Sequence, residues 1–348
     1  MSESIPAPMY PLTCEYAHGG PQIEGLLRGT PADFKVDEVL GFEPSGEGEH
    51  EFLHIRKTGL NTAQLAKDIA RVARVKPMDV GYAGLKDRHA VTTQWFSVYR
   101  PKGDAVDWTQ LENEQVELLL ASRHQQKLRR GQHAANAFSL KLIDCTGDFD
   151  LLEQRFKQIE TQGVPNYFGL QRFGFGGGNL AAAQRLLVDK QPVRNKQLRG
   201  MYLSAARSYL FNQVLRARIE EGSWLNFEEG DVALANNEGV AQQSPTGPLW
   251  GRGRLASGQR IGELETEIIE KFADWCHGLE HAGLKQERRP LCLPVTDLNW
   301  SVDLDKSDSK NKTITVAFSL PVGGYATSVI REVVNYREPE RGRPQREG

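Results

Sequence analysis

Residues 81–98 read Gly-Tyr-Ala-Gly-Leu-Lys-Asp-Arg-His-Ala-Val-Thr-Thr-Gln-Trp-Phe-Ser-Val and carry one carboxylate, Asp87, on a predicted turn between two strand-like runs. Lys86, Arg88 and His89 flank this aspartate. Neighbouring cations favour the ionised form of a carboxylate, so the pattern is typical of a carboxylate that acts as a nucleophile or base. The same residues also suit a solvated charged turn, because Asp and Gly are common in turns.

Apolar periodicity predicts a mixture of strands and helices on both sides of this stretch. Strands are expected within residues 25–39 and at 51–56, 92–99, 116–120, 136–143 and 313–320. Helices are expected at 63–75 and 151–161, and a closing helix after residue 325 is expected to turn Val329, Ile330, Val333 and Val334 inward. A composition shift near Gly163 indicates a domain boundary.

Length and composition restrict the class of protein. The 348 residues, 39% hydrophobic and 25% charged, suffice for two domains. The formal net charge of -2 means that nucleic-acid binding would depend on local basic patches. Four cysteines without C-x-x-C spacing argue against a zinc ribbon or a disulfide framework and favour a reducing cytoplasm. With no secretion signal and no long apolar run, neither secretion nor a membrane location is expected.

Residues 50–54, His-Glu-Phe-Leu-His, match the H-E-x-x-H pattern of zinc peptidases. The pattern needs a helix, which places both histidines on one face next to a metal ion. Glycines at 46, 48 and 59 leave little room for a helix, and in a strand the two histidines would lie far apart. We therefore predict two exposed strand histidines, with a zinc metallopeptidase as the alternative.

Two segments are rich in basic residues. Between 123 and 130 there are five basic side chains and no acid, and the segment leads into a strand with an aromatic residue. Between 190 and 219 there are seven cations and no carboxylate: Lys190, Arg194, Lys196, Arg199, Arg207, Arg216 and Arg218. Such segments suit phosphate contact and base stacking, although solvated surface elements often look the same.

Residues 84–95, Gly-Leu-Lys-Asp-Arg-His-Ala-Val-Thr-Thr-Gln-Trp, resemble the nucleophile motif of the TruD family of tRNA pseudouridine synthases. Further segments resemble signatures of this family and occur in the family's order: 44–50, 136–138, 164–174, 204–213 and 326–332. The resemblance therefore covers most of the chain and is specific.

The resemblance implies an α/β (α+β) fold in which a pseudouridine synthase core has a mixed, largely antiparallel sheet. The core would comprise residues 1–162 and, with its C-terminal strand and helix, residues 299–336. An inserted α/β domain specific to the TruD family would comprise residues 163–298. Residues 337–348, rich in Arg, Glu and Pro, would form a disordered tail.

The resemblance further implies that uridine 13 in the D arm of tRNA is isomerised to pseudouridine. The glycosidic bond to N1 breaks and a bond to C5 forms, with no cofactor and no metal ion. By this resemblance Asp87 is the catalytic nucleophile, which attacks C1′ of the sugar, adds to the base or removes a sugar proton. The uridine has to leave its stack to reach the carboxylate.

Substrate-binding residues also follow from the resemblance. Phe34, Asn136 and Tyr325 match substrate-contacting positions of the family, although Tyr325 stands where some members have phenylalanine. Phe138 matches a position where this family has phenylalanine in place of the tyrosine of other pseudouridine synthases. Lys86 and Arg28 are expected to pair with phosphate or carboxylate groups.

We therefore expect a cytoplasmic, monomeric enzyme, and the resemblance implies that its partner is tRNA. Besides the zinc peptidase, a second alternative is an RNA-binding protein without catalytic activity, which would keep the basic segments and tolerate loss of Asp87.

Overall fold

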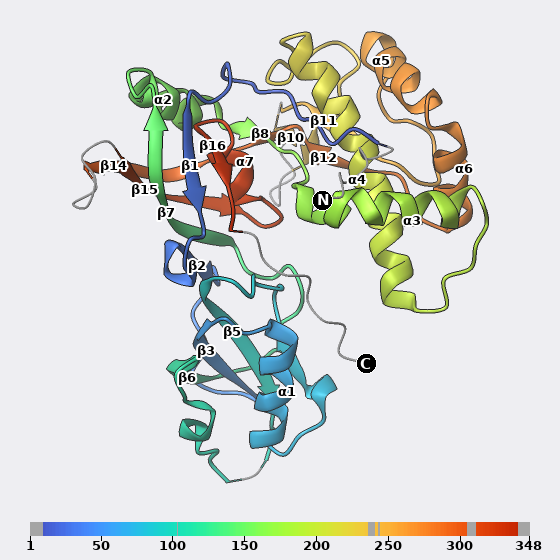
Figure 1. Ribbon diagram of the computed structural model, residues 1–348. Helices are drawn as coiled ribbons and strands as arrows, with labels where there is room; N and C mark the ends of the chain where they lie inside the picture. Colours follow the sequence, from blue (N-terminus) through green and yellow to red (C-terminus); the bar gives the residue numbers. More distant parts are fainter. Residues whose placement is uncertain (1–9, 103, 236–240, 243, 305–310, 340–348) are drawn as a thin grey trace, which may run out of the picture. The chain divides into compact units, whose positions relative to one another are not determined.

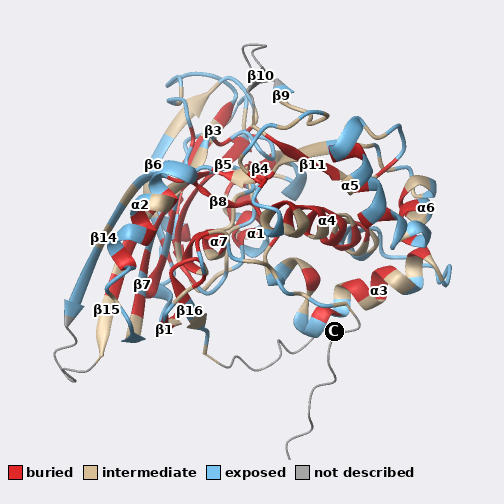
Figure 2. Cartoon of the chain, turned by 90° about the horizontal axis from the view of Figure 1, so that it is seen from above, coloured by how far each residue is buried: buried red, intermediate tan, exposed pale blue. Residues whose placement is uncertain are grey.

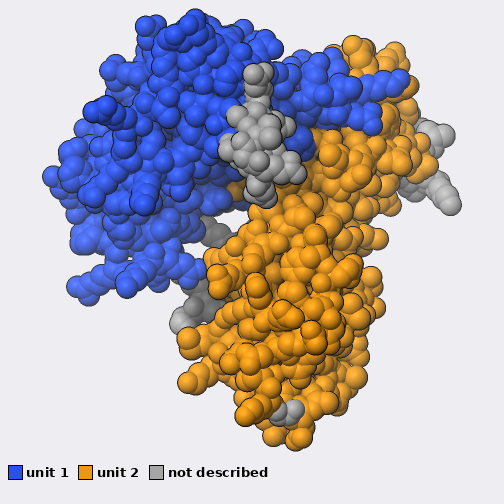
Figure 3. Space-filling view, turned by 180° about the vertical axis from the view of Figure 1, so that it is seen from behind, with its two compact units in different colours: residues 1–20, 157–294, 327–332 blue, residues 21–156, 295–326, 333–348 orange. Residues whose placement is uncertain are grey.

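The computed structural model of the protein (Figure 1) describes residues 10–102, 104–235, 241–242, 244–304 and 311–339. The chain forms two compact units, which Figure 3 shows in different colours. One unit, here called the sheet unit, contains residues 21–156, 295–326 and 333–348. The other, here called the helical unit, contains residues 1–20, 157–294 and 327–332. Each unit is described by itself below.

The sheet unit is built on a mixed sheet with the order β14-β15-β7-β2-β5-β3-β6, to which β1, β16 and β4 add at the sides. β1 pairs with β16, and β2 with β5, in parallel, while its other described pairings are antiparallel. The expected mixed, largely antiparallel sheet is thereby confirmed. Its strands are β1 (Ile23–Leu27), β2 (Phe34–Val39), β3 (His50–Thr58), β4 (Val80–Tyr82), β5 (Val91–Tyr99), β6 (Val116–His124), β7 (Ala135–Gly147), β14 (Thr296–Leu304), β15 (Lys312–Pro321) and β16 (Val334–Arg337).

Helix α1 (Thr62–Val72) covers one face of β3 and β5 (Figure 1). Its stripe of Leu65, Ile69 and neighbouring alanines packs against a buried cluster that includes Leu53, Ile55 and Phe96. This is the apolar spacing from which the helix was predicted, although the helix ends at Val72 and not at 75. Helix α2 (Leu152–Gln162) follows β7, close to its predicted bounds.

The helical unit is organised around α4 (Lys196–Glu220), whose buried residues Figure 2 shows in red. α3 (Gly178–Leu187), α5 (Gln259–Glu270) and α6 (Ala273–His281) pack with it. Its short strands are β8 (Val164–Pro165), β9 (Leu234–Ala235), β10 (Ala241–Gln242), β11 (Thr246–Leu249), β12 (Glu287–Pro290) and β13 (Cys292–Leu293). Short 3-10 turns occur in both units. Those of the sheet unit are Pro31–Asp33, Pro77–Asp79 and Trp108–Leu111, and those of the helical unit are Leu170–Phe173 and Phe175–Gly177. None of the helices among the described residues is long and apolar enough to cross a bilayer.

The predicted closing helix is wrong in its second half. α7 (Ala326–Ile330) ends after one turn, and Val334 begins β16, which pairs with Ile23 on β1. Val333 and Val334 are buried as expected, but tertiary pairing with β1 determines their conformation. Residues 327–332 also belong to the helical unit by their contacts, although the flanking segments belong to the sheet unit.

The end of the chain is ordered further than the predicted tail at 337–348. Arg337 is the last residue of β16, and Glu338 forms an ion pair with Arg28. Residues 340–348 lie outside the described residues, so disorder there stays a prediction. The main segment of the helical unit runs from residue 157 to residue 294. The predicted inserted domain has the bounds 163 and 298, and these bounds stay a prediction.

Candidate active site

The loop between β4 and β5 carries Asp87 and is held by hydrogen bonds from neighbouring elements. The Lys86 N–H donates to Oγ1 of Thr62, at the start of α1, over 3.0 Å. Thr62 Oγ1 in turn donates to Oε1 of Gln94 on β5, and Gln94 Nε2 donates to the Gly84 carbonyl. Since Thr62 and Gln94 are buried, the loop is fixed on two sides by the first turn of α1 and by β5.

Asp87 forms an ion pair with Arg28, the residue that follows β1. Arg28 Nη2 lies 2.7 Å from Asp87 Oδ2, and the side chain of Arg28 is 6% exposed whereas that of Asp87 is 41% exposed. The guanidinium also stacks on the Phe34 ring, 3.8 Å from its centroid, and lies 3.3 Å from Glu338 Oε1. A buried cation thus holds an accessible carboxylate through a charge-assisted hydrogen bond.

Lys86 points into the protein and connects two polar side chains. Its Nζ lies 2.7 Å from Oε2 of Glu38 on β2 and donates to Oδ1 of Asn136 on β7 over 2.6 Å. Glu38 also accepts the Trp95 N–H, at 3.0 Å. Because Lys86 occupies Asn136 Oδ1, the amide group of Asn136 is oriented, with its Nδ2 3.2 Å from Nε2 of His133. Burial and the Lys86 charge lower the pKa of His133, which favours the neutral ring in this contact.

A lysine that the sequence interpretation did not single out lies beneath the loop. Lys57 on β3 is fully buried, and its Nζ donates to the carbonyl oxygens of Leu60 and Asp87 over 2.8 Å and 3.1 Å. Burial lowers the pKa of Lys57 to about 8, opposed by attraction to Asp87. The available sequence signal was its position in β3, where alternation places a charged residue among buried ones.

Three aromatic rings form the floor next to Arg28. Phe138 stacks on Phe318 of β15 with ring centroids 5.5 Å apart, and Phe34 meets Phe138 edge-on at 6.2 Å. The strand register aligns them, because Phe138 of β7 lies opposite both Val36 of β2 and Phe318. All three rings are buried, so they support the Arg28 side chain from within the sheet.

Tyr325 lies in the turn between β15 and α7 and is half-buried. The register of β15 on β7 pairs Leu320 with Asn136 and Pro321 with Ala135. The turn that carries Tyr325 therefore leaves the sheet at the end where Asn136 lies. Direct contacts thus join Asp87 to Arg28, Arg28 to Phe34, and Lys86 to Asn136. The strand register places Tyr325.

Comparison with known proteins identifies the family. The family model described as tRNA pseudouridine synthase D (TruD) matches residues 13–192 and 191–333. The chain belongs to the TruD family. It is 47% identical over 338 residues to tRNA pseudouridine synthase D of Methylococcus capsulatus, with 92% of this chain and 94% of that protein covered. It is 43% identical over 344 residues to the protein of that name from Aeromonas salmonicida, with 94% and 95% covered.

A crystal structure of a TruD protein from Methanosarcina mazei has the same fold. The two structures superpose with a TM-score of 0.70 at 22% sequence identity, and the match covers 91% of this chain and 95% of the other. At this level of identity the likeness shows the fold alone. The family assignment depends on the family model and on the more similar relatives.

The histidines of the H-E-x-x-H segment lie on β3 in this TruD chain, as predicted, but they are not exposed. His50 is buried beside Tyr99, and His54 stacks on Trp95 with ring centroids 4.5 Å apart. Glu51 accepts the Trp108 Nε1–H at 2.7 Å. Among the residues that the structure describes, no group of three or more His, Cys, Asp or Glu side chains could hold a metal ion. The pattern therefore has a packing role here.

The basic segment at 190–219 is less available to a polyanion than its composition suggested. Arg218 is 1% exposed and pairs with the buried Asp231, and Arg207 donates to the carbonyls of Leu249 and Lys285. Both side chains therefore stabilise the helical unit. The exposed cations of this segment lie before α4 and in its first turn: Lys190, Arg194 and Lys196.

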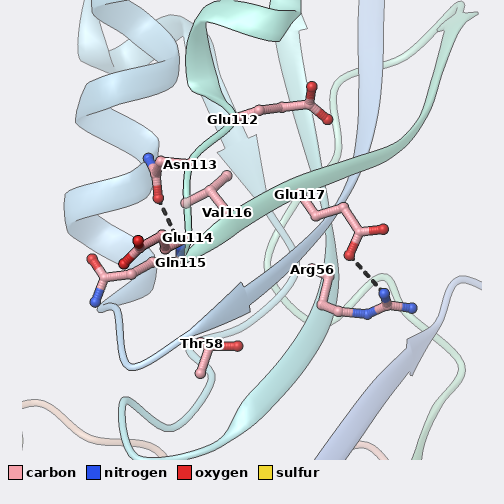
Figure 4. Close-up of a pocket in the computed structure, with 8 residues that line it drawn as sticks. All are labelled: Arg56, Thr58, Glu112, Asn113, Glu114, Gln115, Val116 and Glu117. Carbon is pink, nitrogen blue, oxygen red and sulfur yellow. Dashed lines mark hydrogen bonds and ion pairs between the residues drawn. The ribbon is translucent and has the colours of Figure 1, made fainter.

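A surface hollow of about 330 Å³ lies elsewhere on the sheet unit (Figure 4). Its lining comprises Arg56 and Thr58 of β3 and residues 112–117, which include three glutamates. Arg56 is engaged there by Glu117 at 2.6 Å. The carboxylates would repel a phosphate backbone, so the charge of this hollow does not suit RNA.

Proposed function

We propose that this TruD chain isomerises uridine 13 in the D arm of tRNA to pseudouridine, with Asp87 as the nucleophile. The observation that carries the proposal is the difference in solvent exposure between Asp87 and Arg28, the cation that pairs with it. Its carboxylate is 41% exposed, while Arg28, paired with it at 2.7 Å, is 6% exposed. A carboxylate that is accessible and has a fixed, buried counter-charge suits attack on a nucleoside.

The proposed chemistry is an isomerisation that balances without redox change. The bond between N1 and C1′ breaks, the uracil turns within the site, and a bond between C5 and C1′ forms. C5 loses its proton and N1 gains one, so the atoms balance. Asp87 takes part by attack on C1′, by addition to the base or by removal of a sugar proton. Each route uses the ionised carboxylate, whose Oδ2 accepts a charge-assisted hydrogen bond from Arg28.

Recognition of an extruded uracil is proposed to use Asn136 and Tyr325. The Asn136 amide is oriented by Lys86 and His133, which suits hydrogen bonding to the polar edge of a base. Tyr325 is half-buried and offers a ring for stacking. Phe34 and Phe138 are buried, and the face of Phe34 is covered by the Arg28 guanidinium. We therefore assign to these two rings the support of Arg28 and of the site's floor.

The decisive experiment replaces Asp87 by asparagine, which has the same shape without the charge. Asp87→Asn is expected to abolish pseudouridine formation in a tRNA transcript while tRNA binding changes less than about threefold, because one carboxylate adds nothing to phosphate contact. Asp68→Asn, on the outer face of α1 where it pairs with Arg71, is the matched control and should keep full activity. Retained modification by Asp87→Asn would refute the assignment of the nucleophile.

The position in tRNA is tested with a transcript in which uridine 13 is replaced by cytidine. Pseudouridine formation on that transcript should be absent, and modification at another uridine would contradict the proposed specificity. The alternative of a non-catalytic RNA-binding protein predicts binding of both transcripts and modification of neither. Activity that persists in the presence of a chelator is expected, since the proposed chemistry uses no metal ion or cofactor.

We also propose that the protein acts in the cytoplasm as a monomer. The cysteine pattern, which favours a reducing compartment, supports the location. Light scattering of the purified chain tests the oligomeric state.

A further inference from the structure

Lys57 is a buried charge in the sheet unit that the proposed chemistry does not use. It lies on β3 between β5 and β6, where its neighbours across the sheet are Thr92 and Val116, so neither strand offers it a carboxylate. Its side chain is fully buried. An ammonium group in such a place is costly unless its hydrogen bonds are satisfied, so its contacts require an explanation.

Both described acceptors of Lys57 Nζ are backbone carbonyls. One belongs to Leu60, just before α1, at 2.8 Å, and the other belongs to Asp87 itself, at 3.1 Å. Hydrogen bonds donated by a cation are shorter and stronger than those between neutral groups. Lys57 therefore ties the main chain of the proposed nucleophile to the central strands of the sheet.

The charged groups that face Lys57 come from the same loop. The Asp87 carboxylate attracts its ammonium, and Lys86 repels it. Arg88 is exposed and donates through Nε to the carbonyl of Gly59, next to Leu60. Burial, together with repulsion by Lys86, lowers the pKa of Lys57 from 10.5 to about 8, although attraction to Asp87 opposes the shift. The ammonium is therefore charged at neutral pH and loses its charge in mildly alkaline solution.

We propose that Lys57 is a positioning residue: its buried ammonium holds the main chain of Asp87 so that the carboxylate stays directed toward Arg28 and the open side of the site. This inference rests on the proposed function of Asp87. Thr62 and Gln94 fix the loop at Lys86 and Gly84, and Lys57 adds the contact at the reacting residue. A nucleophile displaced by about 1 Å can lose about 100-fold in rate.

The first test replaces Lys57 by methionine, which has a similar length and no charge. The single-turnover rate of pseudouridine formation should fall about 10- to 100-fold, while the Kd for tRNA stays within about twofold because Lys57 is inaccessible to RNA. The unfolding temperature should not fall, since an apolar side chain replaces a buried cation without a carboxylate partner. Arg56→Met, the adjacent position on β3 with an exposed side chain, is the control and should keep its rate.

The second test is the pH dependence of the single-turnover rate. A neutral amine can still donate two hydrogen bonds, but without the assistance of the charge. The rate of the unsubstituted protein should therefore fall as the pH rises through about 8, and Lys57→Met should lack that fall. A lysine with a merely structural role would leave the two profiles parallel. Absence of the fall in the unsubstituted protein overturns the proposal even if the variant does not fold.

A third measurement needs no enzymatic activity. Trypsin cleaves after Lys86 and Arg88, and in the absence of tRNA Lys57→Met should be cut in this loop several times faster than the control. An unchanged rate of pseudouridine formation in Lys57→Met, or a loss matched by an equal loss of tRNA affinity, overturns the proposal. If the unsubstituted protein itself does not modify tRNA, the proposed function fails. The rates of tryptic cleavage alone then decide whether Lys57 holds the loop.

Discussion

Replacement of Lys86 by methionine tests the buried network behind the candidate active site. Lys86 Nζ lies 2.7 Å from Oε2 of Glu38, whose side chain is completely buried, and Glu38 otherwise accepts the Trp95 N–H. Methionine would leave the Glu38 charge buried with one neutral donor. Removal of one partner from a buried ion pair costs about 3–5 kcal/mol of unfolding free energy, and urea denaturation of Lys86→Met should show a loss of that size.

A double-mutant cycle with Glu38→Gln separates the charge effect from lost packing. Glutamine keeps an oxygen for the Trp95 N–H and removes the charge, so the double variant should recover at least about 2 kcal/mol relative to Lys86→Met. Pseudouridine formation should not recover, because Asn136 still lacks the 2.6 Å hydrogen bond that orients its amide. A loss below about 1 kcal/mol in Lys86→Met, or no recovery in the double variant, would refute the reasoning.

Three further perturbations follow from the same geometry. Arg28→Met removes the 2.7 Å charged hydrogen bond to Asp87 and should lower the single-turnover rate about 10- to 100-fold, and an unchanged rate would exclude a role for the pair. Gly81→Ala would place Cβ 2.3 Å from the Leu128 carbonyl and should cost about 1–3 kcal/mol in urea denaturation, whereas Gly84→Ala, whose Cβ would meet nothing nearer than 3.7 Å, should cost less. Between pH 8 and 10.5 Lys57 binds a proton in the unfolded protein and has lost it in the folded protein. With rising pH, the unfolding free energy of the unsubstituted protein should therefore increase relative to that of Lys57→Met. A difference between the two proteins that does not change with pH would contradict the lowered pKa.

Local pattern was sufficient for most strands and for the first helix. β15 alternates Ile314, Val316, Phe318 and Leu320, which are all buried, and it was predicted within a residue of each end. The same reasoning placed residues 50–54 on a strand, which argues against the zinc peptidase. Local pattern failed after α7, where the apolar residues Val333 and Val334 fit a helix and a strand equally well. Their strand conformation depends on hydrogen bonding to β1, more than 300 residues earlier in the chain.

Charge patterns in the sequence were a poor guide to exposure. Arg218 stands in a run of cations and was expected on a basic surface, but it is buried against Asp231, which lies beyond the end of α4. His50 was expected to be exposed and is buried beside Tyr99. A side chain's partner is set by which segments the fold brings together, and composition within a window does not contain that information.

The sequence by itself determined the family, the alternation that builds the sheet and the presence of one aspartate on a turn flanked by cations. Only the tertiary structure decided which cations matter. Arg28 and Lys57 both contact Asp87, although they precede it in the sequence by 59 and 30 positions. Lys86, its immediate neighbour, instead contacts Glu38 and Asn136. The physical reason is strand register: the pairing of β2, β3, β5 and β7 fixes which side chains share a face, and no local pattern encodes a register between distant strands.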